Sequence, residues 1–345
     1  MYVLTTGAIK NAGDYLIHER CRALIERFAQ PHAIEVVPRW QPMDDRLETI
    51  NRARALVLCG GPAYQRDFHP GCVPFVQPLD RIAPPIVPMA VGLGSGVPAD
   101  AIDSFTFDPP SLEALRWIHQ RIDHSSARDV LTEQVLRRHG IDNVVTTGCA
   151  AWYHLDHVDR DYVAPGTIRR VGVSNPAHLN FDQAINLLKL LRKRFRRATR
   201  YLVFHRGFVQ QPLRGSPTNR AVTLANYRLA ARAAVMGFRI VNAAGAKRDR
   251  GIYDHCDLHI GYRVHAHLDF LSRRKPSILL QEDIRGVGQS RTLGTRDVDA
   301  KAADALAQIE SIIDHHENNQ YSDFGAVVDQ MRERFALMQA FVKTL

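Results

Sequence analysis

The chain has 345 residues, more than one hydrophobic core of ordinary size accommodates, so about two domains are expected. With 45% hydrophobic and 23% charged residues, the composition is globular and excludes a protein dominated by disorder. The formal net charge of +9 favours an anionic partner, which leaves nucleic acid, membrane headgroups and a phosphorylated substrate as candidates.

Cysteine usage and hydropathy narrow the class further. The five cysteines are scattered without a C-x-x-C pair, which argues against a disulfide framework or a structural zinc site and favours a reducing compartment. The N-terminus begins as a strand and not as a signal peptide, and no stretch reaches the roughly 18 apolar residues of a membrane span. We therefore expect a soluble cytoplasmic protein, with a position at the inner face of the membrane left open.

Short apolar runs alternate with helical patterns along the first half of the chain. The expected strands are residues 2–5, 34–37, 55–59, 86–91 and 144–147, and the expected helices are residues 15–28, 112–120 and 129–139. Strands that lead through loops into helices predict a parallel sheet with helices on both faces.

The same alternation restarts after residues 162–167, a stretch with proline and glycine that we interpret as the interdomain linker. The expected strands are residues 169–174, 199–204, 239–242, 257–261 and 277–281, and the expected helices are residues 181–194, 224–236 and 264–272. Two amphipathic helices follow, separated near residues 318–321.

The alternation predicts an α/β protein with two Rossmann-like domains that face each other across a cleft. The N-terminal domain is expected over residues 1–162, completed by a helix over 322–345, and the second domain over 168–300, with 301–345 as a helical tail. Ligands of such sheets bind beyond the carboxyl ends of the strands. The loops at those ends are therefore the places to look for chemistry.

The first of these loops is rich in small residues. It contains Asn11, Gly13 and Asp14, and free N–H groups at the start of the next helix attract anions or hydroxyls. The loop matches neither G-x-G-x-x-G nor the G-K-[ST] ending of a phosphate loop, so it does not support nucleotide binding. A structural role, in which Asn11 and Asp14 cap the helix and form the turn, is equally compatible with the sequence.

Further signals follow later strands. Gly60, Gly61 and Gly94 belong to glycine clusters that either mark one rim of a cleft or form tight turns. Arg128 precedes a helix at the same edge, where it suits an anion, although a surface arginine beside an N-cap Asp129 is the plainer interpretation.

The most informative segment runs from residue 260 to 269. A strand ends at Gly261 and a helix begins near Arg263, so Arg263 and His265 lie where helix-start N–H groups favour an anion. Arginine has a planar fork that matches phosphate or carboxylate, and histidine transfers protons near neutral pH. His267 faces another way and is interpreted as an ordinary helix-face histidine, so no metal site is expected here.

With these features the sequence resembles the polysaccharide pyruvyl transferase family over roughly its first 300 residues. The resemblance rests on order and spacing: the Asn11-x-Gly13-Asp14 loop, Gly60-Gly61, the glycines of residues 91–96, Arg128-Asp129, and the late block from Arg263-Val264-His265 through Lys275-Pro276 to Arg285 and Gly294. Two departures are Cys149-Ala150-Ala151, where the family often has Asp-Pro-Ala, and Arg285, where it often has lysine.

The resemblance implies a GT-B-like fold and transfer of pyruvate from phosphoenolpyruvate to a sugar, with ketal formation and release of phosphate. It implies donor binding and catalysis by Arg263 and His265. His265 would protonate the methylene carbon, and Asp14 would orient or deprotonate an acceptor hydroxyl. The donor carries a carboxylate and a phosphate, so arginines are expected to neutralise it without a metal or other cofactor. The expected donor set is Arg128, Arg206, Arg263 and Arg285, with Asn11, Gly13, Gly60, Gly61 and Gly94 as acceptor or loop contacts. Arg206 is included for its position after the expected strand over residues 199–204 and not through the resemblance, and a structural role suits it nearly as well.

Other functions and partners stay open. A GT-B-type nucleotide-sugar glycosyltransferase would need a carboxylate for a ribose, and the loop over residues 245–251 offers only Asp249. A nucleic-acid-binding protein would account for the basic run over residues 192–197, but no aromatic residues interleave with it and no groove-reading motif is present. That run would equally suit anionic lipid headgroups or a lipid-linked acceptor. A homo-oligomer is also compatible with the sequence.

Overall fold

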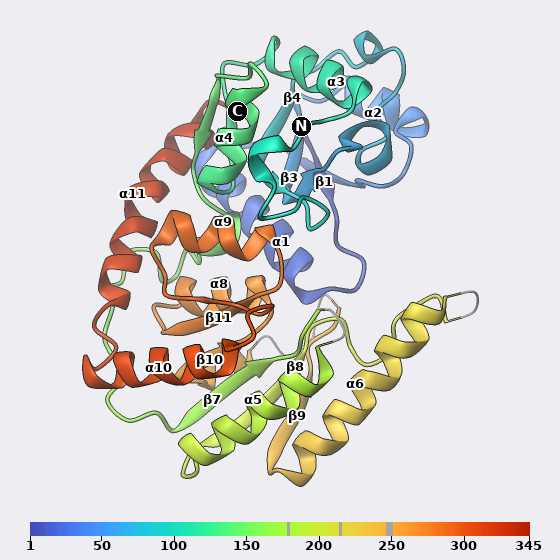
Figure 1. The fold of residues 1–345 in the computed structure, drawn as a ribbon. Helices are drawn as coiled ribbons and strands as arrows, with labels where there is room; N and C mark the ends of the chain where they lie inside the picture. Colours follow the sequence, from blue (N-terminus) through green and yellow to red (C-terminus); the bar gives the residue numbers. More distant parts are fainter. Residues whose placement is uncertain (178–179, 214–215, 246–250) are drawn as a thin grey trace.

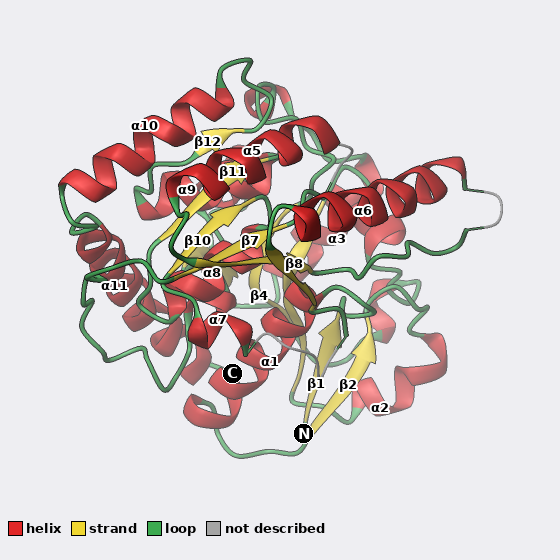
Figure 2. Ribbon diagram, turned by 90° about the horizontal axis from the view of Figure 1, so that it is seen from below, coloured by secondary structure: helices red, strands yellow, loops and turns green. Residues whose placement is uncertain are grey.

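The computed structural model describes residues 1–177, 180–213, 216–245 and 251–345, and in this part of the chain it contains two six-stranded parallel sheets flanked by helices (Figures 1 and 2). The strand order is β2-β1-β3-β4-β5-β6 in the N-terminal sheet and β12-β11-β10-β7-β8-β9 in the C-terminal sheet. The order in which strands are added to the sheet reverses between β1 and β3 in the N-terminal sheet and between β7 and β10 in the C-terminal sheet. The predicted pair of Rossmann-like domains is confirmed.

The strands have the following bounds. The N-terminal sheet contains β1 (Tyr2–Thr6), β2 (Ile34–Pro38), β3 (Ala55–Tyr64), β4 (Ile86–Leu93), β5 (Ser125–Ala127) and β6 (Val144–Thr146). The C-terminal sheet contains β7 (Arg170–Ser174), β8 (Thr199–Phe204), β9 (Phe238–Asn242), β10 (Leu258–Gly261), β11 (Ser277–Gln281) and β12 (Val298–Asp299).

The helices connect these strands and close the chain. In the N-terminal domain they are α1 (Ala12–Phe28), α2 (Leu47–Asn51), α3 (Pro109–His119) and α4 (Val130–Arg138). In the second half of the chain they are α5 (Phe181–Arg194), α6 (Pro217–Val235), α7 (Ile252–His255), α8 (Val264–Ser272), α9 (Ile284–Leu293), α10 (Ala305–Asn318) and α11 (Phe324–Lys343). In the described part of the chain, no helix combines the length and the apolarity that crossing a bilayer requires.

Several predicted element ends are wrong: helices α3 and α6, for example, begin at Pro109 and Pro217 and not at residues 112 and 224. Two further differences have a clear local reason. Helix α1 begins three residues earlier than expected, because the Asn11 side chain caps it by accepting a hydrogen bond from the Gly13 N–H at 3.3 Å. Strand β3 does not open into a loop at Gly60 and Gly61 but runs through them to Tyr64. Both glycines have positive φ, and the pairing of β3 with β4 resumes beyond them.

The C-terminal helix α11 returns to the N-terminal domain, as predicted (Figure 1). It packs against α1, β5 and β6. The Phe335 ring lies 5.9 Å from the Phe28 ring of α1 and 5.0 Å from the Tyr153 ring, measured between centroids. Phe335 and Phe341 are therefore buried within their own chain, and not on an outer surface where they would serve as a dimer interface.

The two domains also touch directly on both sides of the region between the sheets. The Ala12 N–H donates to the His205 carbonyl at 3.0 Å. On the other side, the Trp152 indole N–H donates to the Gln289 side chain of α9 at 2.7 Å, and the Val130 N–H donates to Thr292 Oγ1 at 3.1 Å. The first contact holds the start of α1 against the loop after β8, and the other two hold the N-terminal domain against α9.

Candidate active site

A pocket forms where the points of strand-order reversal in the two sheets face each other. Doubly wound folds bind their ligands at such topological switch points. Together with the solvent-open space at its mouth, it measures about 420 Å³. Its walls come from the loop after β1 and from the segments that follow β7, β8, β10 and β11. The lining residues are Asn11, Ala177, His205, Arg206, Tyr262, Arg263, Val264, His265, Glu282, Asp283 and Arg285.

The backbone fixes Arg263 at the start of α8. Its N–H donates to Ser174 Oγ at 3.0 Å, its Nε donates to the Asn175 carbonyl at 3.0 Å, and Nη2 donates to the Pro176 carbonyl at 2.9 Å. Burial is the main cause that lowers the pKa of its guanidinium to about 10, so the group keeps its charge at neutral pH. One edge of the fork is therefore used to hold the side chain, and the remaining N–H groups are available to a ligand.

His265 lies one residue into α8, against the first turn of α1. A Cβ atom added to Gly13 would come within 2.7 Å of the Nδ1, Cγ and Cβ atoms of His265, so only glycine permits this approach. Burial, and then the charges of Arg285 and Arg128, hold the pKa of the imidazole well below its ordinary value. The ring is therefore neutral at pH 7 without a ligand.

Arg285, in the first turn of α9, is engaged by a carboxylate. Its Nε and Nη2 donate to the two oxygens of Asp283 at 2.8 and 2.6 Å, and Asp283 also caps the helix. Burial opposes the charge of Arg285, but the hydrogen bonds and charge of Asp283 outweigh it and raise the pKa of the guanidinium. An anionic ligand would share this arginine with Asp283.

The other two predicted donor arginines differ in position. Arg206 is exposed at the rim of the pocket. Arg128 is 2% exposed and does not line the pocket; its Nη2 donates to the Leu93 carbonyl at 2.9 Å and its Nε pairs with Asp129 at 3.2 Å. It lies close enough to lower the pKa of His265 electrostatically. The plainer interpretation as a surface arginine is wrong, because the side chain is buried.

The residues predicted for the acceptor side divide into two groups. Asn11 lines the pocket, and Gly13 abuts His265. Asp14, in the first turn of α1, is half-buried, and burial raises the pKa of its carboxyl despite a hydrogen bond to Asn11 and the charges of Arg206, Arg39 and Arg285. A raised pKa suits a proton acceptor.

The three other glycines lie farther along the edge of the first sheet, outside the pocket. Gly60 packs against Ile17 of α1, and Gly94 against Gln65. A Cβ atom on Gly61 would lie 3.2 Å from Arg39 Nη1. These glycines shape the edge of the N-terminal domain.

Several pocket residues were not predicted. The carboxylates Glu282 and Asp283 directly follow β11, and their position at a strand end was the signal that could have identified them. Glu282 accepts hydrogen bonds from the Ala177 N–H and from the Asn180 side chain at 2.7 and 3.1 Å. Tyr262 lines the pocket with a hydroxyl that has no hydrogen-bond partner among the described residues.

Arg39 was also missed. It follows β2, and a Cβ atom on Gly7 would lie 3.1 Å from its Nη2. Its charge offsets part of the rise that burial causes in the pKa of the Asp14 carboxyl. No sequence motif marked it, because its role depends on β2 lying next to β1.

These features define a two-domain α/β protein with a pocket of arginine, histidine and carboxylate side chains between GT-B-like domains. The sequence model of the family described as polysaccharide pyruvyl transferase matches residues 11–283. The match covers most of the chain, so the chain belongs to the polysaccharide pyruvyl transferase family. A search of curated proteins finds no match.

Solved structures share the fold at low sequence identity. S. aureus MnaA in complex with UDP has a TM-score of 0.53 and 11% identity, covering 96% of this chain and 90% of that one. A putative UDP-N-acetylglucosamine 2-epimerase from Listeria monocytogenes has a TM-score of 0.52 and 10% identity, covering 98% and 94%. The wall teichoic acid polymerase TagF has a TM-score of 0.50 and 10% identity, covering 99% and 87%. These similarities support the two-domain GT-B-like architecture.

Proposed function

We propose that this protein transfers pyruvate from phosphoenolpyruvate to a sugar of a polysaccharide, a glycan or a lipid-linked precursor, forming a ketal and releasing phosphate. The observation that carries the proposal is the convergence of Arg206, Arg263 and Arg285 with His265 in one pocket. Three guanidinium groups match a donor that carries both a carboxylate and a phosphate. Family membership supports the same reaction class.

The chemistry follows from the position of His265. A proton from its imidazolium adds to the methylene carbon, which becomes a methyl group, and the adjacent carbon becomes electrophilic. One acceptor hydroxyl adds there, phosphate leaves with the C–O bond electrons, and a second hydroxyl closes the ketal. Of the two hydroxyl protons, one restores the imidazolium and the other leaves on phosphate. We infer that Asp14, whose carboxyl pKa is raised by burial, accepts the second of these hydroxyl protons and passes it on to phosphate.

The acceptor has room next to the donor pocket. A larger hollow, about 1180 Å³ together with the solvent-open space at its mouth, lies between residues 95–100 of the N-terminal domain and residues 281–284 of the second domain. It shares Glu282 and Asp283 with the donor pocket. Carboxylates are the usual hydrogen-bond acceptors for sugar hydroxyls. We propose that the sugar enters from this side.

One experiment tests the proposed function. The protein is incubated with phosphoenolpyruvate and an array of sugars and glycans, phosphate release is measured, and ketal products are sought by mass spectrometry. Phosphate release that depends on both substrates, without a nucleotide, supports the proposal. Transfer of a sugar from a nucleotide-sugar donor, with no reaction of phosphoenolpyruvate, would support the glycosyltransferase alternative. Asp249, the carboxylate considered for that alternative, lies outside the described residues.

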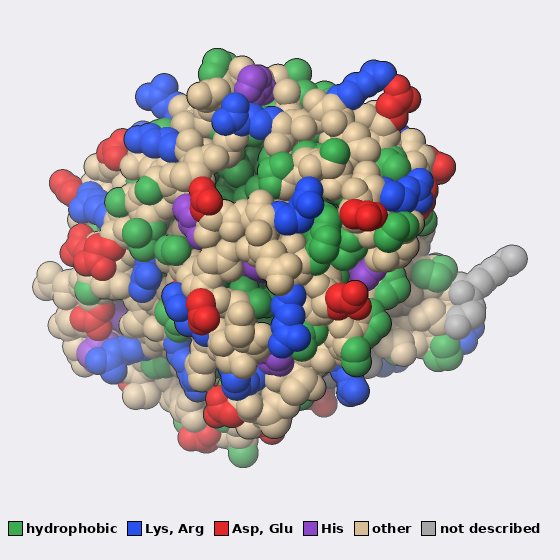
Figure 3. Space-filling model, turned by 90° about the horizontal axis from the view of Figure 1, so that it is seen from above, with side chains coloured by type: hydrophobic (Ala, Val, Ile, Leu, Met, Phe, Trp, Pro, Cys, Tyr) green, Lys and Arg blue, Asp and Glu red, His purple; other side chains and the backbone are tan. Residues whose placement is uncertain are grey.

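The nucleic-acid alternative gains no support from the charge distribution. Arg194, within the basic run at the end of α5, forms ion pairs with Asp314 and Glu317 of α10. On the face of the molecule shown in Figure 3, basic and acidic side chains are interspersed. Acidic neighbours weaken the attraction of such a surface for a phosphate backbone.

Arg263→Lys is expected to weaken phosphoenolpyruvate binding by about tenfold, which corresponds to one lost charge-assisted hydrogen bond. Lysine keeps the charge, but it loses the fork and the anchoring bonds to the carbonyls of Asn175 and Pro176. Calorimetry with phosphoenolpyruvate measures the change. Arg220→Lys, in exposed α6, is the control and should bind as wild type does. Unchanged affinity in Arg263→Lys would show that the fork does not hold the donor.

Donor binding is expected to take up a proton. Burial and the surrounding arginines hold the pKa of His265 well below its ordinary value in the free protein, and an anionic donor would raise it. Between the free and bound pKa values, affinity should therefore fall as pH rises, by up to about tenfold per pH unit. Calorimetry in buffers of different ionisation enthalpy measures the protons taken up. The same titration of His265→Gln, which cannot accept that proton, should show a smaller uptake; equal uptake would contradict the assignment.

A further inference from the structure

The turn between α10 and α11 lies where the chain passes from one domain to the other. Helix α10 packs against α5 and β12 of the C-terminal domain, whereas α11 packs against α1 and the N-terminal sheet and also contacts α9. Gln320 and Tyr321 both have positive φ, at 55° and 62°, a conformation that bulky residues rarely adopt. This backbone turns sharply and brings Asp323 back against the last turn of α10.

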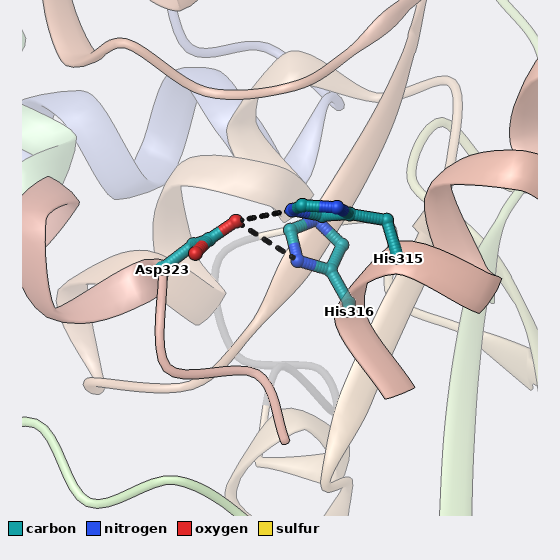
Figure 4. Close-up of side chains that lie close together, drawn as sticks. All are labelled: His315, His316 and Asp323. Carbon is teal, nitrogen blue, oxygen red and sulfur yellow. Dashed lines mark hydrogen bonds and ion pairs between the residues drawn. The ribbon is translucent and has the colours of Figure 1, made fainter. Parts of the chain in front are cut away.

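Three potential metal ligands converge at this turn (Figure 4). His315 Nε2 lies 2.6 Å from Asp323 Oδ2, and His316 Nδ1 lies 3.9 Å from the same oxygen. One ligand atom of each of the three residues lies within 4.8 Å of the others. In a tetrahedron with metal–ligand bonds of about 2.0–2.1 Å the ligand atoms lie about 3.3–3.4 Å apart, so binding an ion would open the His315–Asp323 contact and draw His316 closer.

Buried polar atoms without partners gather at the same place. The His316 side chain is 3% exposed, and neither of its ring nitrogens has a hydrogen-bond partner among the described residues. Asn319 Oδ1 and the Tyr321 hydroxyl, in the same turn, are also buried without partners there. Burying polar groups in this way is costly unless something satisfies them. His316 Nδ1 points towards Asp323, so one ion would satisfy it.

We propose that His315, His316 and Asp323 bind a divalent transition-metal ion of the zinc class. Two imidazole nitrogens and one carboxylate are a ligand set that zinc accepts, with water able to complete a tetrahedron. Calcium and magnesium are disfavoured, because they take oxygen ligands. The Arg296 side chain, 3.8 Å from Asp323, is 61% exposed and can move away from an incoming cation.

The site lies outside the pocket, and it does not depend on the proposed reaction. The sequence predicts no metal for the transfer chemistry, and this ion takes no part in that chemistry. Its role is to fix the angle between α10 and α11, and through these helices the arrangement of the two domains. Because such an ion binds only the folded chain, it stabilises that chain by a free energy that grows with the logarithm of the ion concentration once this exceeds the dissociation constant.

The test uses the full chain without a histidine tag, treated with a chelator and then titrated with Zn²⁺ by calorimetry. Binding of one ion per chain is expected, together with a Tm that rises with zinc concentration. Co²⁺ provides a second probe, because its visible absorption reports tetrahedral coordination. The variants are His315→Gln and Asp323→Asn, chosen because both side chains are 40% exposed and tolerate substitution better than buried His316.

Each variant should weaken zinc binding by at least about tenfold. Replacing a residue that only hydrogen-bonds to a metal ligand already costs about this much affinity, and here a ligand itself is replaced. The matched control is His157→Gln. His157 and His154 form another close histidine pair, 4.5 Å apart between ring centroids, with Asp156 near His154. The control should bind zinc as wild type does. The proposal is overturned if wild type binds no zinc, if the two variants bind it unchanged, or if His157→Gln weakens it equally.

Discussion

Replacing His265 with alanine is expected to lower turnover by about 10²–10⁴-fold, the usual contribution of a general acid. The imidazole lies at the start of α8 and lines the pocket together with Arg263 and Arg285. Donor binding should bring it a proton, and no other histidine except His205 lines the pocket in the described part of the chain. His205 is already engaged in a hydrogen bond with Tyr253.

Phosphate release from phosphoenolpyruvate in the presence of acceptor measures this effect, and circular dichroism checks the fold. His265→Gln separates hydrogen bonding by the side chain from proton delivery. Glutamine can still donate a hydrogen bond, but it cannot deliver a proton to carbon at neutral pH. Loss of turnover in both variants, with donor binding retained, is the expected result. Activity near the wild-type level in folded His265→Ala would rule out the role of proton donor.

Helix periodicity and strand ends were sufficient to predict the segment of the pocket that contains Arg263 and His265. Helix α8 and strand β11 have the predicted bounds, since both are apolar segments with polar residues at their ends. Because Arg263 and His265 follow a strand and begin a helix, their meeting in one pocket was predictable. Local pattern was sufficient there.

Contacts between distant segments were not predictable from the pattern. Strand β5 was missed because two of its three residues are serines. Their burial is possible because Ser126 Oγ accepts a hydrogen bond from the Ala90 N–H and Ser125 Oγ is hydrogen-bonded to His119. The burial of Arg128 depends on β4 lying beside it, because its Nη2 donates to the Leu93 carbonyl. In each case a partner elsewhere in the fold decides the outcome, and polarity alone misleads.

Gly13→Ala is expected to lower turnover by at least about 100-fold, since a misplacement of about 1 Å at a reacting group has this effect. The added Cβ atom would lie within 2.7 Å of three atoms of His265, far inside contact distance. His265 is only 7% exposed and cannot simply swing aside. Either the imidazole moves or the first turn of α1 separates from α8, and both changes displace the proton donor from the pocket.

Gly325→Ala is the matched control for this change. Gly325 is the second residue of α11, as Gly13 is of α1, and a Cβ atom there meets nothing within 4 Å. Alanine is the better helix former at either position, so neither variant should lose helix stability. Gly325→Ala should therefore keep full turnover, whereas Gly13→Ala should lose it while its far-ultraviolet circular dichroism stays unchanged. Equal turnover in the two variants would show that the contact between α1 and His265 does not position the proton donor.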